Sequence, residues 1–118
     1  MDEAQMKRRT KEFAKEVIRL CRRLPRNREG RLIGDQLFRA GTSVAANYRA
    51  ACRARSRAEF VSKLAIVEEE ADESVFWLEL IEEMRLLRHP TVSSLLQEAD
   101  EILAIIVSSI KTARRAKK

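Results

Sequence analysis

The stretch RAGTSVAANYRAACRARSRAEF, residues 39–60, decides the fold of this chain because it combines small residues, five arginines and a helix start. Gly34 and Gly41 lie inside a predicted helix, where each glycine costs about 1 kcal/mol relative to Ala. We therefore expect another helix to pack so closely that a Cβ would not fit. The stretch ends in Ser56 and Glu59, spaced as a capping box that starts a further helix. Its arginines either contact a phosphate backbone or only face water.

Apolar residues on both sides of this stretch recur at helical spacing and predict four amphipathic helices. Their expected bounds are about 3–24, 29–54, 57–88 and 91–115. The third helix carries a heptad seam of Phe60, Leu64, Val67, Ala71, Ser74, Leu78 and Ile81. Four such helices with short connections predict an all-α fold, an antiparallel up-down-up-down four-helix bundle that forms a single domain over 1–118.

Composition excludes several classes of protein. The chain has 118 residues, of which 45% are hydrophobic and 36% charged, so it can bury a core. No apolar run reaches the ~18–20 residues that cross a bilayer, and the N-terminus contains acidic residues and is not followed by the apolar segment of a secretory signal. Cys21 and Cys52 are too few for a disulfide scaffold and lack CxxC spacing. These features predict a cytoplasmic protein without membrane contacts.

Charge is segregated along the chain. Residues 1–57 hold 16 Lys/Arg and 6 Asp/Glu, a net charge of +10. Residues 58–104 hold 3 and 12, a net charge of −9, and residues 105–118 hold 5 and none. A basic face is the usual mark of a polyanionic partner, although basic and acidic helices can also pair in self-assembly.

The basic residues predict a nucleic-acid-binding surface. Five of them fall within an arc of about 80° on the first helix, opposite its apolar stripe. Others gather at the corner after the second helix and in the C-terminal tail KTARRAKK. No series of aromatic residues accompanies them, which argues against base stacking along a single strand. The candidate nucleic-acid-binding residues are Arg8, Lys11, Lys15, Arg19, Arg22, Arg53, Arg55, Arg57, Lys111, Arg114 and Arg115.

Several polar residues are expected to form a structural network rather than a catalytic site. Asn47 and Ser43 are helical neighbours on the predicted inner side of the second helix, and Arg39 lies one turn before Ser43. Glu70 and Glu73 lie at about the same level on the third helix. Buried polar groups normally bond to one another, so we expect a buried network that joins Asn47, Ser43 or Arg39 to Glu70 or Glu73.

No residue pattern indicates an enzyme. The only histidine, His89, lies beside Pro90 without a Glu three residues before it, so the Glu-x-x-His pairs of di-iron bundles are missing. Neither Ser43 nor the cysteines can be assigned a histidine base, and no glycine-rich phosphate loop occurs. We predict no catalytic residue, no metal site and no cofactor.

The same central region resembles the four-helix-bundle family of proteins encoded in 23S rRNA intervening sequences. The resemblance covers the chain beyond residue 10, although Glu69-Glu70 stands where some members carry Gly-Ser. It implies a bundle that assembles into a homopentameric ring, without an established activity. A distant relative is similar to the nucleic-acid-binding accessory protein of diversity-generating retroelements. The matching residues are Arg39-Ala40, Ser43-Val44, Asn47, Arg49, Arg53, Arg55-Ser56, Glu59-Phe60, Lys63-Leu64, Glu70-Ala71, Glu73 and Trp77-Leu78.

Two functional hypotheses follow. The first is a non-enzymatic protein that binds nucleic acid, with RNA favoured, through basic faces of an oligomeric ring. The second is a structural or scaffolding oligomer that docks a protein partner and whose charges serve assembly.

Overall fold

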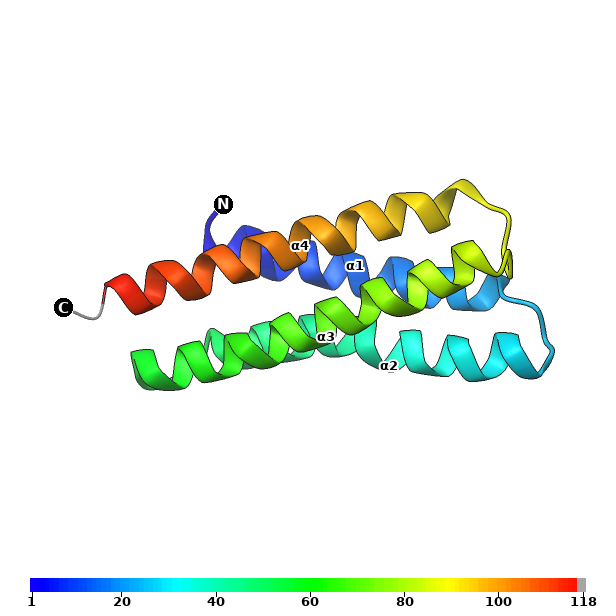
Figure 1. The fold of residues 1–118 in the computed structure, drawn as a ribbon. Helices are drawn as coiled ribbons and strands as arrows, with labels where there is room; N and C mark the ends of the chain where they lie inside the picture. The colour runs from blue at the N-terminus through cyan, green and yellow to red at the C-terminus, as the bar shows by residue number, and fades with distance from the viewer. Residues whose placement is uncertain (117–118) are drawn as a thin grey trace.

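Four helices form an all-α bundle in the computed structural model, which describes residues 1–116. They are α1 (Glu3–Arg23), α2 (Arg28–Ala51), α3 (Arg57–Glu83) and α4 (Pro90–Arg115). Each helix runs opposite to the one before it (Figure 1). Contacts join α1 to α2, α2 to α3, α3 to α4 and α4 back to α1, so the helices surround one core. Residues 117 and 118 of the predicted basic tail lie outside the described residues.

The core contains the apolar stripes that the helical spacing predicts. Six of the seven residues in the predicted α3 seam are buried, and Phe60 is half-buried against the core. Thr10 and Ser74 are buried hydroxyls, and each donates a hydrogen bond to a carbonyl one turn earlier. The largest fully buried apolar side chains are Leu20, Leu37, Leu64, Leu78, Ile81, Ile102, Ile106, Val17, Val44 and Val67.

Polar side chains cap the start of each helix. Asp2 and Gln5 form a capping box at α1, with bonds of 2.8 and 2.9 Å, and Asn27 accepts a hydrogen bond from the third amide of α2. Nδ1 of His89 accepts from the amide of Thr91 at 3.0 Å at the start of α4. Because these side chains satisfy amides that have no partner within the helix, they fix where the helices begin.

The predicted capping box at α3 is half formed. The Ser56 hydroxyl accepts from the Glu59 amide at 3.1 Å, whereas no return bond from the Glu59 side chain is present. The serine alone caps the third amide of the helix, as N-cap serines do.

Helix α3 ends at Glu83, five residues before the predicted end at residue 88. Arg85 adopts the left-handed conformation, with φ 53°. The Leu86 amide then donates to the Ile81 carbonyl at 3.0 Å, and the Arg85 amide donates to the Glu82 carbonyl at 3.2 Å. These two bonds form a Schellman motif, which normally uses glycine at the left-handed position. Without a glycine, the sequence gives no sign of this stop; α2 likewise ends at 51 rather than 54.

The glycines of α2 lie where α1 approaches. A Cβ added to Gly41 would lie 2.8 Å from Cγ2 and 2.9 Å from Cγ1 of Val17. A Cβ added to Gly34 would lie 3.0 Å from Cδ1 of Leu24. Both glycines therefore let α1 and α2 pack at short distance, as the sequence predicts.

No helix within residues 1–116 combines the length and apolar character needed to span a membrane.

Candidate functional site

A groove between α1 and α2 gathers basic residues from both helices. It has a volume of about 580 Å³. Lys7 and Lys11 project from α1, Arg49 from the last turn of α2, and Arg53 from the turn that follows. All four are exposed, and the groove between them is lined by Thr42, Ala45 and Ala46. Lys11 and Arg53 are predicted site residues, whereas Lys7 and Arg49 are additions from the structure.

The packing of α1 against α2 explains the shape of this groove. The methyl groups of Ala45 and Ala46 occupy little volume, so space remains above them between the two helices. Lys7 and Lys11 are four residues apart on α1, which places their Cβ atoms about 5–6 Å apart on one side of the helix. The Thr42 hydroxyl donates to the Phe38 carbonyl at 2.7 Å and so is already satisfied within α2.

The groove is electrostatically unbalanced. No carboxylate lines it, and Lys7, Lys11, Arg49 and Arg53 form no ion pair with any residue in the part of the chain that the structure describes. Four cations that share a concave surface without counter-charges create a positive potential that attracts anions.

The bundle brings the remaining basic segments to the same end. Helix α1 begins where α2 and α4 end and α3 begins, at the left in Figure 1. The Arg57 guanidinium donates to the Ala116 carbonyl at 2.5 Å, which links the start of α3 to the end of α4. This basic end of the molecule displays exposed predicted residues from three segments, namely Arg55, Arg57, Lys111, Arg114 and Arg115.

The predicted arc on α1 is not an uninterrupted cationic stripe. Arg8 is exposed, but Lys15 pairs with Glu12 at 3.0 Å and Arg19 pairs with Glu16. The acids lie three residues before their partners, so part of the arc is neutralised on its own helix. Arg22 is exposed near the opposite end of the bundle. The structure thus divides the predicted nucleic-acid-binding residues among the groove, the basic end and the rest of α1.

Arg9 makes a contact that the sequence analysis missed. Its guanidinium donates to both oxygens of Glu98 and to Glu101, with the shortest N–O distances at 2.7 Å. The hydrogen bond that Arg9 donates to Glu98 is the main reason why the pKa of Arg9 lies above its usual range. This ion pair joins α1 to α4 and removes Arg9 from the free basic surface.

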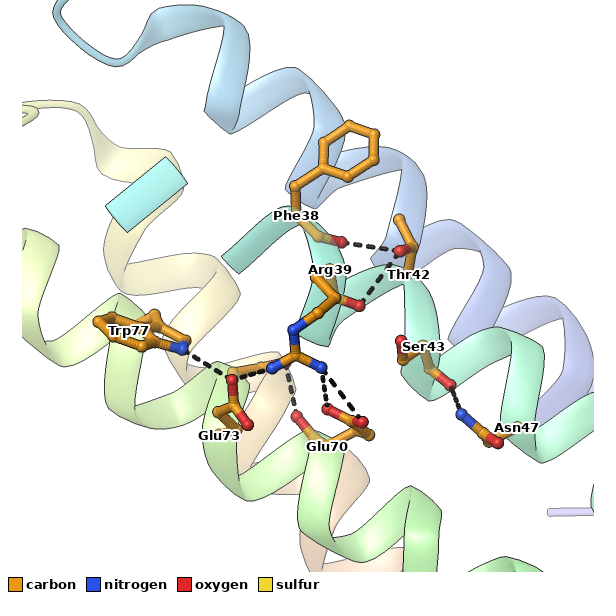
Figure 2. A network of polar contacts seen from close by, with 9 residues as sticks. Phe38, Arg39, Thr42, Ser43, Asn47, Glu70, Glu73 and Trp77 are labelled. Atoms are coloured by element: carbon orange, nitrogen blue, oxygen red, sulfur yellow. Dashed lines mark hydrogen bonds and ion pairs between the residues drawn. The ribbon is translucent and has the colours of Figure 1, made fainter. Parts of the chain in front are cut away.

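Arg39 joins α2 to α3 through two carboxylates (Figure 2). It donates to Glu70 at 3.1 Å and also contacts Glu73, which accepts from Nε1 of Trp77 at 3.1 Å. The bonds from Trp77 and Arg39 lower the pKa of Glu73. The sequence predicts a buried network, but the Arg39 side chain is 47% exposed. The network therefore lies at the surface, because the glycines and apolar residues of α2, and not its arginine, face the core.

Ser43 and Asn47 are not part of that network. Nδ2 of Asn47 donates to the Ser43 carbonyl at 2.9 Å, on its own helix (Figure 2). Both residues are half-buried, whereas Tyr48 is buried. The inner side of α2 is therefore centred closer to Tyr48 than predicted, and Asn47 finds its partner one turn back instead of on α3.

The cysteines are separate thiols in environments that disfavour the reactive thiolate. Burial raises the pKa of Cys21 to about 11, and its Sγ lies 3.5 Å from the Gly34 carbonyl. Burial also raises the pKa of Cys52. Within residues 1–116, no three His, Cys, Asp or Glu side chains are grouped in a way that could hold a metal ion.

Phe38 is a second feature that the sequence analysis missed. Its side chain is 45% exposed, on the side of α2 away from the carboxylates that bind Arg39 (Figure 2). It lines a hollow of about 280 Å³ near the junction of α1 and α2, which also contains Arg22, Arg26 and Arg31. Helical phase could have identified it, because Phe38 is rotated about 100° from the buried Leu37.

The fold and groove define an all-α four-helix bundle with a basic groove between its first two helices. The chain belongs to the 23S rRNA-intervening sequence protein family, whose family model matches residues 2–108. It is also similar to a crystallised protein of unknown function from the S23 ribosomal protein family of Bacteroides thetaiotaomicron. The two share 33% identity with a TM-score of 0.85 over 94% of this chain and 99% of that one. A comparison with curated proteins finds no match.

Proposed function

We propose that this protein is a non-enzymatic, cytoplasmic RNA-binding bundle protein that contacts phosphates through the α1–α2 groove and the basic end. The observation that carries the proposal is the set of four cations around the groove, Lys7, Lys11, Arg49 and Arg53, which form no ion pair within residues 1–116. Lys and Arg contacts to phosphates supply affinity without reading sequence. The groove has no carboxylate that would repel a polyanion.

The family name favours RNA over DNA as the ligand. The family is named for an intervening sequence of 23S rRNA, and this chain carries that family's pattern along most of its length. The raised thiol pKa values of Cys21 and Cys52 disfavour a cysteine nucleophile, since the thiolate is the reactive form.

The proposed functional form is a homo-oligomer, and the resemblance favours a pentameric ring. A ring would repeat the groove on every subunit. A long RNA that bridges several grooves would then bind more tightly than one groove allows, because later contacts are intramolecular.

The test is RNA-binding anisotropy across a salt series, with duplex DNA as a comparison. Four phosphate contacts predict that log K falls with log salt at a slope of about −3 for a single strand and about −4 for a duplex. Replacing Lys11 and Arg49 by Ala should make the slope shallower by roughly 1.5. The matched control replaces Lys15 and Arg19, which removes the same charge from residues that are already ion-paired. The proposal fails if the protein does not bind at low salt, or if both variants lose affinity equally.

A scaffolding function is the second candidate, favoured by apolar side chains on α2 and α3. Leu32 is 55% exposed, Ile66 42%, Phe76 50% and Met84 62%. Exposed apolar residues mark a protein-binding surface where they form a contiguous patch. In this alternative the charges serve assembly, so the oligomer should dissociate in high salt, and added RNA should change neither its mass nor its stability.

A further inference from the structure

Phe38 gives the basic groove an aromatic neighbour. It precedes Thr42 on the groove floor by four residues, so the two lie on the same side of α2, one turn apart. The Thr42 hydroxyl bonds to the Phe38 carbonyl, which joins these two turns directly. The exposed ring therefore continues the groove lengthwise toward the opposite end of the bundle.

Cations continue on both sides of the ring. The hollow beside Phe38 is bordered by Arg22 from α1, Arg26 from the connecting segment and Arg31 from α2, with Asp35 as its one carboxylate. The Arg31 guanidinium is anchored by the Arg26 carbonyl at 3.1 Å. Basic residues thus lie at both ends of a seam between α1 and α2 that extends from Lys7 to Arg22, about 22 Å at the helical rise of 1.5 Å per residue.

Cations along a groove together with an exposed aromatic ring are the features that bind single-stranded nucleic acid. The cations follow the backbone, and a base stacks on the ring whatever its identity. In a duplex, bases are stacked inside the helix and cannot lie on a protein side chain without being extruded. A seam of about 22 Å has room for roughly six nucleotides of a strand stacked as in a duplex, at ~3.4 Å each, and for fewer nucleotides of an extended strand.

We infer that the seam binds a single-stranded segment of RNA, with the backbone in the Lys7–Arg53 groove and one base stacked on Phe38. This inference rests on the proposed function and specifies its ligand. One ring supports one stacked base rather than a continuous row, and the cations remain the main source of affinity. The groove floor carries only small side chains, so binding should depend little on base sequence.

The test compares Phe38→Ala with Phe76→Ala in the full chain. Phe76 is an exposed phenylalanine of α3, packed edge-on against Trp77 at a centroid distance of 4.9 Å, and it lies outside the seam. The probes are a fluorescein-labelled single-stranded RNA of ~12 nucleotides and a hairpin of matched length whose loop is replaced by a non-nucleotide linker, so that all its bases are paired. Phe38→Ala should weaken binding to the single strand by about 5- to 100-fold and leave hairpin binding unchanged. Phe76→Ala should change binding to neither the single strand nor the hairpin.

A second variant separates stacking from packing. Phe38→Leu keeps an apolar side chain and the fold but removes the aromatic face, so it should weaken single-strand binding almost as much as Phe38→Ala. In an RNA that carries 2-aminopurine, binding to the unmodified protein should quench the fluorescence, and both Phe38 variants should lose this quenching. Thermal unfolding followed by circular dichroism verifies that each variant is folded.

Several results would overturn the inference. If Phe38→Leu binds the single strand as tightly as the unmodified protein, no base stacks on the ring. If both Phe38 variants lower the oligomer mass measured by light scattering, the Phe38 side chain serves subunit assembly instead of RNA binding. If the unmodified protein binds the hairpin but not the single strand, the inference fails while the proposed function stands. If it binds neither probe at low salt, both fail.

Discussion

Replacing Gly41 by Ala tests the close approach of α1 and α2 that forms the groove. In an isolated helix this change is favourable by about 1 kcal/mol, because Ala is a better helix former than Gly. In the bundle the added methyl group would lie 2.8 and 2.9 Å from the two γ-carbons of Val17 and 3.1 Å from its Cβ. Distances below 3.0 Å require the neighbour to move.

Val17 has little freedom to move. It is fully buried, and a β-branched residue in a helix has one strongly preferred rotamer. The close contact with the added methyl group can therefore be relieved only if α1 shifts away from α2. Overpacking of this kind lowers the free energy of unfolding by about 1–3 kcal/mol. Against the gain in helix propensity, we expect Gly41→Ala to lower the free energy of unfolding by about 1 kcal/mol. That loss corresponds to a decrease in Tm of about 4 °C for a domain of this size.

Gly34→Ala is the matched control. Its added methyl group would lie 3.0 Å from Cδ1 of Leu24, the far end of a flexible side chain. Here the gain in helix propensity should outweigh the contact with Leu24 and stabilise the protein by up to ~1 kcal/mol. Urea unfolding of both variants, followed by circular dichroism, measures the difference. If Gly41→Ala raises the unfolding midpoint as much as Gly34→Ala does, the close packing against Val17 does not determine this position.

A double-mutant cycle adds a check on the cause. Val17→Ala removes both γ-carbons that the new methyl group would meet, at the cost of a cavity. Gly41→Ala should therefore be less destabilising, or stabilising, in the Val17→Ala background. Equal effects in both backgrounds would show that the two sites do not interact.

Two further predictions concern the ends and the surface of α3. Arg85→Gly should raise the free energy of unfolding by about 1 kcal/mol in urea titrations, because it relieves a left-handed residue with φ 53°; a loss of stability would contradict this account. The lowered pKa of Glu73 means that its bonds to Trp77 and Arg39 stabilise the fold at neutral pH and lose this effect as the carboxylate is protonated in acid. Glu73→Gln should lower the free energy of unfolding by at most ~1 kcal/mol at about pH 7, since the carboxylate is partly exposed, and by less at about pH 3. An equal loss at both pH values would refute this prediction.

The helices of this chain could be predicted well from sequence because apolar spacing and caps are local signals. The Ser56 cap marks the start of α3, and the glycines of α2 correctly indicate a close neighbour. The end of α3 could not be predicted, since its stop depends on Arg85 in a conformation that usually requires glycine. The predicted place of Asn47 on the inner side of α2 is also wrong, because an error of about one residue in the helix phase moves a side chain from the core to the edge of the buried face.

The candidate site was predictable only in part. A helical wheel finds the basic arc of α1, but it does not show which cations have partners on other helices. Arg9 lies on α1, and its partners are 89 and 92 residues away on α4. Likewise, Lys7 and Arg49 belong to one groove only because α1 and α2 are antiparallel. The distribution of charge among free and paired residues is therefore a property of the tertiary structure.

The small residues and the arginines of residues 39–60 have complementary roles in the groove. On the inner side of α2, Gly41 sets the distance to α1. On the outer side, Ala45 and Ala46 leave space above that contact. The cations of α1 and α2 then face each other across this space, at a separation that the glycine contact determines. A larger residue on the floor would fill the groove, and a wider helix spacing would separate the two rows of cations, so the packing of this stretch is a condition for the phosphate binding proposed above.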